Sequence, residues 1–355
     1  MLRRTFALPT IAFALSLLGS TNAEAAGQRT FVASDGNDLN PCTLLLPCRT
    51  FAPAIAATSA AGEVIVLDSA GYGSFTITQS ISIIAPPGVY AGFSPTAGQD
   101  GVIITAGVND RVVLRGLTIN GQGGTKGIVV NSGGQVHIEQ CTVSNMVGDG
   151  IWINGGGQIH IRSSIVRRSG AAGLWSGGGT QKVEVLDSQF TANLDGIQVE
   201  RGTLDARRIA ADNNLGTGVR LLFLPASTTA VVTLTDSIMS GNGAHGVWVQ
   251  ADNSGSVARL AMVRSTSARN TLDGITALGA ATVKVSVSDS ALVENARDGM
   301  RVSGGAGVSA VLTRSTLAHN GEDEARQFGS AVLRSAENNM KVNSTSGIIT
   351  PLPQF

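Results

Sequence analysis

Histidine, aspartate and tryptophan residues at repeating positions are the parts of this sequence that could support chemistry. His245, Asp273 and Asp298 each stand directly before a glycine, 28 and 25 residues apart. A histidine beside two carboxylates could supply a general acid and a general base at one bond. The three groups can act together only if the fold returns the chain to the same place after each interval. The elements around them therefore decide whether they form a site.

The position before the glycine also holds aspartates that have no acid or base nearby in the pattern. Asp149 and Asp195 are the examples. An aspartate before a glycine commonly accepts backbone hydrogen bonds within a turn, and this is the simpler explanation of the whole column. We therefore treat His245, Asp273 and Asp298 as catalytic candidates only if the protein is an enzyme.

All three tryptophans share a second position, two residues after the glycine. This position holds Trp152, Trp175 and Trp248, and it also holds Arg220 and Arg301. Alternation along a strand makes the position face outward. Surface aromatic rings stack well on sugars, so the three tryptophans and Arg220 are predicted to bind a glycan. Two alternatives stay open: other segments could cover the rings, or the rings could stack across the strands and stabilise the sheet.

The glycines mark the repeat that must position these side chains. Aliphatic residues follow them at the first and third positions, as in Ile151 with Ile153 and Val247 with Val249. A period of two indicates a strand whose aliphatic side chains face inward. The repeat glycines, spaced 22 to 28 residues apart, are Gly127, Gly150, Gly173, Gly196, Gly218, Gly246, Gly274 and Gly299.

Two more columns follow each of these strands. The first is predicted at Cys141, Ser164, Ser188, Arg207, Ser237, Ser265, Ser290 and Ser315. Cys141 thus stands in a serine column, which favours a buried and unreactive thiol. The second, an asparagine column expected to bond along a stack, is predicted at Asn145, Asn193, Asn213, Asn242, Asn270, Asn295 and Asn320. Insertions fall on one edge of the repeat and are longest after Gly218 and Gly246, where they are expected to wall a binding face.

Units of this length, built from short strands and turns, resemble the right-handed parallel β-helix of the pectin-lyase-like superfamily. The resemblance covers roughly residues 64–345 and implies an all-β, single-domain solenoid like those of many secreted bacterial proteins, most without an assigned activity. The segment Asn270 to Gly274, taken with His245, is also faintly similar to the polygalacturonase pattern. Here the two motifs come in the reverse order, and the pattern's adjacent aspartate pair and Arg-x-Lys are missing.

The first 62 residues are predicted to contain a signal peptide followed by a cap that covers the end of the solenoid. Residues 1–25 have the basic start, apolar run and small-x-small end of a signal peptide, so the protein is expected to be secreted, periplasmic or at the cell surface. Cys42 and Cys48 can then form a disulfide in a cap over residues 26–62, which includes a short helix over 50–61. The β-helix is expected over 63–345 and a tail over 346–355.

Composition narrows the possible partners. The chain has 25 basic and 25 acidic residues, which argues against a nucleic-acid clamp, and the mature part has no apolar run that could span a bilayer. No metal-ligand or cofactor-binding spacing occurs, so no cofactor or metal is expected. A polysaccharide or surface glycan is the expected partner. The sequence favours a non-catalytic carbohydrate-binding or extracellular structural protein, and the alternative is a polysaccharide lyase or glycoside hydrolase acting on an acidic glycan.

Overall fold

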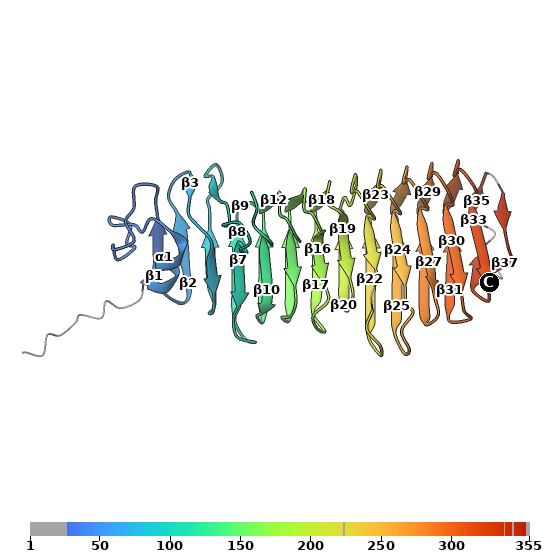
Figure 1. The fold of residues 1–355 in the computed structure, drawn as a ribbon, viewed down its shortest axis with the longest axis horizontal. Coiled ribbons are helices and arrows are strands. Elements are labelled where there is room, and N and C mark those ends of the chain that lie inside the picture. The colour runs from blue at the N-terminus through green and yellow to red at the C-terminus, as the bar shows by residue number, and fades with distance from the viewer. Residues whose placement is uncertain (1–26, 223, 337, 343, 353–355) are drawn as a thin grey trace, which may run out of the picture.

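The protein is an elongated solenoid of stacked coils, and its described residues include one short helix, at the N-terminal end of the stack (Figure 1). The computed structural model describes residues 27–222, 224–336, 338–342 and 344–352. The predicted signal peptide, residues 1–25, lies outside these described residues. Each coil contributes a strand to up to three parallel sheets, which run along the length of the solenoid and are named sheets A, B and C.

Sheet A is the longest, with 14 strands in parallel register. Its strands are β1 (Gly27–Val32), β2 (Thr58–Val66), β5 (Ile81–Ile84), β8 (Arg111–Arg115), β11 (Gln135–Glu139), β14 (Gln158–Arg162), β17 (Lys182–Leu186), β20 (Gly202–Arg207), β22 (Thr229–Thr235), β25 (Val257–Val263), β28 (Thr282–Ser288), β31 (Val308–Thr313), β34 (Val332–Ser335) and β37 (Ile349–Pro351).

Sheet C has 12 strands and carries the predicted site residues. Its strands are β4 (Phe75–Ile77), β7 (Val102–Thr105), β10 (Ile128–Ser132), β13 (Ile151–Ile153), β16 (Ala172–Ser176), β19 (Asp195–Val199), β21 (Val219–Leu221), β24 (Val247–Gln250), β27 (Ile275–Gly279), β30 (Met300–Gly304), β33 (Ala325–Gly329) and β36 (Thr345–Ser346). Strand pairing in sheets A and C therefore continues past residue 345, where the solenoid was expected to end.

Sheet B is made of short strands in two runs of six and five. They are β3 (Ala70–Gly71), β6 (Ala91–Phe93), β9 (Leu117–Asn120), β12 (Thr142–Ser144), β15 (Ile165–Arg167) and β18 (Gln189–Thr191), then β23 (Ile238–Ser240), β26 (Thr266–Ala268), β29 (Ala291–Val293), β32 (Thr316–Ala318) and β35 (Met340–Lys341). Ala210 bridges the two runs, because it pairs with Gln189 on one side and with Ile238 on the other.

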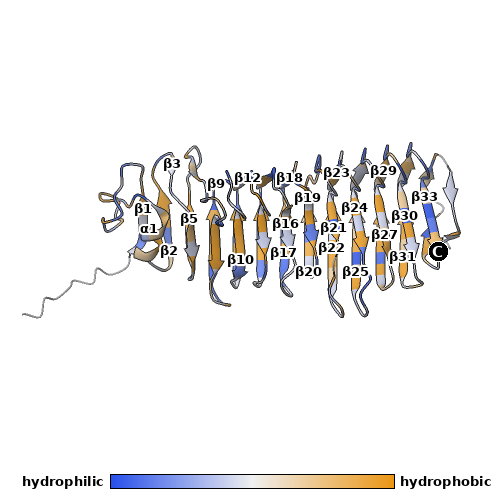
Figure 2. Cartoon of the chain, viewed as in Figure 1, coloured by the Kyte–Doolittle hydropathy of each residue, from blue (hydrophilic) through white to orange (hydrophobic). Residues whose placement is uncertain are grey.

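The core is a column of mostly aliphatic side chains that fills the inside of the solenoid, joined by a few buried aromatic rings such as that of Tyr72. The residues predicted to face inward are fully buried, as Ile151, Ile153, Val247 and Val249 show. Apolar and polar residues alternate along the strands (Figure 2). Burial of apolar surface is thus repeated coil by coil, which explains how a chain with 4% aromatic residues can build a core.

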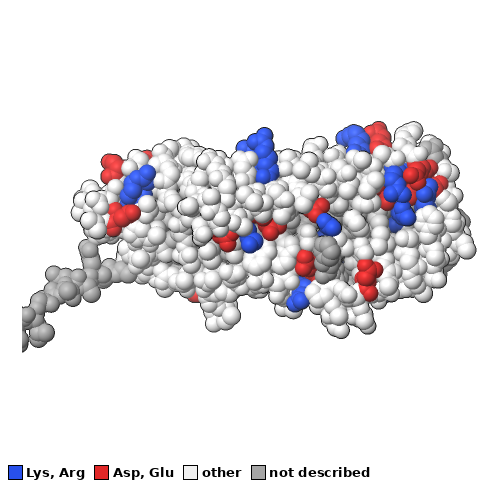
Figure 3. Space-filling view, viewed as in Figure 1, with Lys and Arg blue, Asp and Glu red and all other residues white. Residues whose placement is uncertain are grey.

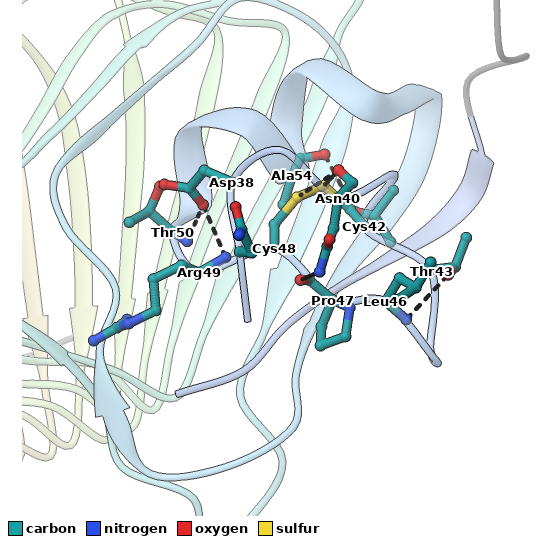
Figure 4. Close-up of a disulfide and its surroundings, with 12 residues drawn as sticks. Asp38, Asn40, Cys42, Thr43, Leu46, Pro47, Cys48, Arg49, Thr50 and Ala54 are labelled. Atoms are coloured by element: carbon teal, nitrogen blue, oxygen red, sulfur yellow. Dashed lines mark hydrogen bonds between the residues drawn. A yellow bond between two sulfur atoms is a disulfide. The ribbon is translucent and has the colours of Figure 1, made fainter. Parts of the chain in front are cut away.

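An N-terminal cap covers the first coil. Helix α1 (Phe51–Ala57) is shorter than the 50–61 segment predicted, because the chain turns into β2 at Thr58 to pair with β1. Cys42 and Cys48 form the expected disulfide in the loop before the helix (Figure 4). Asp38 closes this loop by accepting hydrogen bonds from the backbone N–H groups of Arg49 and Thr50, both at 2.8 Å.

The asparagine column is a buried ladder, but two of its members were predicted wrongly. It comprises Asn193, Asn214, Asn242, Asn270, Asn295 and Asn320, each of which accepts a hydrogen bond from the backbone N–H of the preceding coil. Asn213 and Asn145 lie one residue earlier, where the backbone turns through positive φ of 54° and 59°, although the amide of Asn145 still bonds along the stack, to Asn120 Oδ1 at 2.8 Å. The pattern could not separate the left-handed turn residue from its neighbour, because asparagine suits both places.

The serine column is confirmed except in one coil. Ser164 Oγ accepts a hydrogen bond from the N–H of Cys141 at 3.2 Å, which places that thiol in the column and buried, and burial raises the pKa of Cys141 to about 11. Ile209, not Arg207, occupies the column in the short coil, since its N–H donates to Ser237 Oγ. Arg207 ends β20 and forms an exposed ion pair with Asp205.

Candidate functional site

His245, Asp273 and Asp298 come together in one column at the entry to sheet C. They lie two residues before β24, β27 and β30, which pair in that order, and the Nδ1 of His245 is 3.4 Å from Asp273 Oδ2. Asp273 Oδ1 accepts a hydrogen bond of 3.1 Å from the N–H of Asp298. All three side chains are buried, and Asp273 and Asp298 expose 0% of their surface.

Backbone hydrogen bonds between coils occupy most of these acceptor atoms. The same contact recurs along the column: the carboxylates of Asp149, Asp195, Asp273 and Asp298 accept the N–H of Ala172, Thr217, Asp298 and Asp323 at 3.0, 2.8, 3.1 and 3.2 Å. His245 Nδ1 lies 3.3 Å from the N–H of Asp273 in the same role. The column therefore links successive turns of the solenoid.

The two central carboxyl groups differ in acidity. Burial and the charge of Asp273 raise the pKa of Asp298 to about 6, although Arg326 opposes this shift. Burial also raises the pKa of Asp273, but the contact with His245 and the hydrogen bonds from Thr276 Oγ1 and the N–H of Asp298 outweigh it and leave that pKa below its ordinary value. Asp298 Oδ2 accepts no hydrogen bond within the described part of the chain. A pair with separated pKa values is the arrangement that acid–base chemistry uses.

The tryptophans lie half-buried on the outer face of sheet C. The indole rings of Trp152 and Trp175 stack with centroids 5.0 Å apart and an angle of 13° between their planes. Lys126 Nζ lies 4.8 Å from the Trp152 ring centroid, and Trp175 Nε1 donates to Glu200 at 2.9 Å. Each ring therefore uses part of its surface on its neighbours, as expected if the tryptophans also stabilise the sheet.

Trp248 belongs to a separate group that includes a charged pair. Arg220 Nη1 donates to Asp195 Oδ2 at 2.6 Å, so this aspartate does have a partner, contrary to what the spacing indicated. The Arg220 guanidinium carbon lies 5.3 Å from the Trp248 ring centroid, and His245 meets the same ring edge-on at 5.0 Å. The aromatic column and the aspartate column are therefore in contact here.

A dense group of charges covers the C-terminal coils of the same face, over β30 and β33 (Figure 3). Arg326 pairs with Asp298, Asp323 and Glu322 at 3.2, 2.7 and 2.7 Å. Beside it, Arg301 lies over the ring of Phe328, with its guanidinium carbon 5.2 Å from the centroid. Phe328 exposes 43% of its surface.

The sequence missed this group because the repeat glycine is replaced there. Asp323 follows Asp298, and Arg326 follows Arg301, by the 25 residues that separate Asp298 from Asp273. Glu324 stands where glycine was required, so the glycine-based register ended at Gly299. A search at a fixed 25-residue interval would have found it.

The predicted insertions lie beside Trp248. Between them is a hollow of about 240 Å³, lined by Leu222, Leu224, Gln250, Asp252 and Asn253. Three larger hollows, of about 260, 460 and 570 Å³, are lined by none of the predicted site residues. Across the described residues, no three histidine, cysteine, aspartate or glutamate side chains are placed to hold a metal ion. Nor does any described helix have the length and apolar character needed to cross a membrane.

Comparison with known proteins agrees with this geometry. The family description "right handed beta helix region" matches residues 100–262. The protein is a right-handed parallel β-helix protein. A search of curated proteins finds no match to its sequence.

Solved structures similar to the β-helix protein include several polysaccharide enzymes. Pectate lyase Pel9A superimposes with a TM-score of 0.52 at 15% identity, covering 89% of this chain and 79% of the lyase. The A-module of a mannuronan C-5 epimerase of Azotobacter vinelandii gives 0.54 at 14% identity, covering 81% and 91%. The catalytic domain of a GH87 alpha-1,3-glucanase gives 0.54 at 10% identity, covering 92% and 70%. At these identities the likeness shows the fold alone.

Proposed function

We propose that the β-helix protein is a secreted, non-catalytic carbohydrate-binding protein that holds a polysaccharide or surface glycan along the outer face of sheet C. The observation that carries the proposal is the contrast between two columns on that sheet. Trp152, Trp175 and Trp248 keep part of their surface exposed, whereas Asp273 and Asp298 are fully buried. A ligand can touch the first column but reaches the second only if the strands move.

The chemistry of the outer column suits a sugar chain. The exposed parts of the indole rings offer apolar surface to the C–H face of a sugar, and a row of such rings along a solenoid matches an extended polymer. Three proteins of similar structure, a pectate lyase, a mannuronan C-5 epimerase and an alpha-1,3-glucanase, act on polysaccharides, which supports a glycan partner in a general way. The Cys42–Cys48 disulfide fits an oxidising compartment.

A screen of the mature chain against pectin, alginate, xylan and bacterial surface glycans tests the proposal. We expect one or more of them to shift the tryptophan fluorescence and to bind without release of reducing ends or unsaturated products. The double variant Trp152→Ala with Trp175→Ala should weaken binding, while the exposed Arg259→Ala on sheet A should not. Fluorescence that stays unchanged across the whole panel would contradict the proposal.

The second candidate is a polysaccharide lyase or glycoside hydrolase. The observation that favours it is the separation of the pKa values of Asp298 and Asp273 beside His245. Under this alternative, product would accumulate in the same screen and would disappear in Asp273→Asn with the fold intact. Turnover with that dependence would replace the binding proposal.

A further inference from the structure

We propose that Arg301 and Phe328 form a subsite for an acidic sugar residue, one that carries a carboxylate, at the C-terminal end of sheet C. This inference rests on the proposed glycan-binding function and specifies the chemistry of the ligand. The charged group of the ligand would then be bound at this end of the sheet, away from the stacked tryptophans.

The geometry of the subsite follows from the register of the last coils. Arg301 and Arg326 are strand partners on β30 and β33, and Ser303 and Phe328 are partners two residues further on. Side chains two residues apart on a strand share a face, so these four side chains form one outward patch. Both guanidinium carbons lie near the Phe328 centroid, at 5.2 Å for Arg301 and 5.8 Å for Arg326.

The two arginines differ in how their charge is neutralised. Arg326 contacts three carboxylates, those of Asp298, Glu322 and Asp323. Arg301 forms no ion pair with any described residue, and its guanidinium lies over the Phe328 ring. A half-buried guanidinium without a carboxylate partner can donate two parallel hydrogen bonds to the carboxylate of a ligand.

Phe328 supplies the second half of a sugar site. Trp152 and Trp175 cover part of each other, whereas the Phe328 ring leaves 43% of its side chain open to solvent. The C–H face of a pyranose could pack on this ring while its carboxylate meets Arg301 and a hydroxyl reaches Ser303. A ring beside an unneutralised guanidinium therefore fits an acidic sugar better than a neutral one.

The test measures binding of defined tetrasaccharides by calorimetry. The probes are the tetramers of galacturonate, glucuronate and mannuronate, their methyl esters, neutral cellotetraose and a sulfated malto-oligosaccharide. We expect at least one uronate tetramer to bind the wild-type chain about tenfold or more tightly than its ester, because the charge-assisted contact is lost on esterification. The difference should shrink as salt is added.

Variants assign the effect to the patch. Arg301→Ala should lose about tenfold for the uronate and little for the ester, and Arg301→Lys should retain part of the affinity. Phe328→Ala should weaken both. Arg334→Ala, an exposed arginine on β34 at the same end of the solenoid but on sheet A, is the matched control and should change neither. Circular dichroism and melting temperature check that each variant is folded.

The outcomes separate this inference from the proposed function. Equal binding of ester and uronate, with Arg301→Ala unchanged, overturns the subsite and leaves glycan binding standing. Equal or tighter binding of the sulfated probe through Arg301 overturns the choice of a carboxylate. If no oligosaccharide or polysaccharide binds, both proposals are wrong.

Discussion

At the scale of single residues, the aspartate column of the β-helix protein serves contacts between coils. Asp273 and Asp298 each accept the N–H of the following coil, and both are closed to solvent. Asp298 is the less well satisfied of the two, because its Oδ2 has no hydrogen-bond donor among the described residues. A buried carboxylate with an unused oxygen should be costly when ionised.

The pH dependence of stability tests this description of Asp298. Its pKa of about 6 lies above the ordinary value of 3.8, so the folded form holds this proton more tightly than the unfolded form. The contribution of Asp298 to the free energy of unfolding is therefore complete below about pH 4 and is lost as the pH rises through 6, by about 3 kcal/mol. The side chain in Asp298→Asn cannot ionise. The free energy of unfolding of this variant, relative to that of the wild type, should therefore rise by about that amount between pH 4 and pH 7. Urea denaturation of both proteins measures the difference, and a difference that does not change with pH contradicts the prediction.

At the scale of the elements, the buried asparagine ladder holds adjacent turns in register. Asn270 Oδ1 accepts the N–H of Asn242 at 3.0 Å, and Asn270 Nδ2 donates to Asn295 Oδ1 at 2.9 Å and to the Met239 carbonyl at 3.1 Å. Each rung thus satisfies backbone groups that the bend between sheets B and C leaves unpaired.

Asn270→Ala should lower the free energy of unfolding by about 2–4 kcal/mol, because it leaves a buried N–H and a buried carbonyl without partners. Asn213→Gly is the matched control. Asn213 lies outside the ladder at a φ of 54°, a backbone conformation that glycine adopts without strain. This change should therefore have little effect on the free energy of unfolding. Thermal melts of the two variants make the comparison, and similar losses would show that the ladder contributes nothing special.

A second element-scale feature is an alternating column of charges at the bend between sheets A and B. Asp187 pairs with Arg208, Asp236 with Arg264 and Asp289 with Arg314, at 2.6, 2.8 and 2.7 Å. These side chains stand at left-handed positions one coil apart, with φ from 45° to 52°. The alternation places each of the four inner charges between two charges of opposite sign.

Arg264→Asp would put three acidic side chains in a row and should lower the urea midpoint, more at low salt than at high salt. The double change Asp236→Arg with Arg264→Asp exchanges the two signs within one pair. Its urea midpoint should be no higher than that of the single variant, because each exchanged residue would then stand beside a like charge in the next coil. Recovery of wild-type stability by the double change would show that only the isolated pair matters.

At the scale of the whole molecule, the solenoid is protected at its N-terminal end by the cap. In a stack of repeats each coil contacts only its neighbours, so the terminal coils open most easily. The Cys42–Cys48 bridge restrains the loop that leads into α1, next to the edge strand β1.

Mild reduction should therefore loosen the cap before the rest of the solenoid. We expect amide exchange in β1 and α1 to speed up, by an amount equivalent to about 2 kcal/mol, while sheet C is unchanged. Hydrogen exchange on the oxidised and reduced chain provides the comparison. Uniform acceleration along the whole chain would contradict a local role.

The fold was predictable from the sequence because its signals repeat. Inward aliphatic pairs such as Ile151 and Ile153 recur from coil to coil. A strand that is assigned wrongly in one coil can therefore be reassigned from the pattern in the next. The site was less accessible. The position of each residue relative to the repeat glycine predicted that Trp152 lies beside Trp175. It did not predict that their rings stack, because stacking depends on side-chain rotamers. The sequence did not predict the contact between Arg301 and Phe328. These residues lie on adjacent coils, and the second coil lacks the repeat glycine that set the register.

The most direct test of the proposed function is a crystal structure of the mature chain with the tightest-binding oligosaccharide. We predict an intact sugar chain along the outer face of sheet C, with contacts to the Trp152–Trp175 pair or to Arg301 and Phe328. A sugar bound elsewhere, or a cleaved product in contact with Asp273 and Asp298, would contradict it.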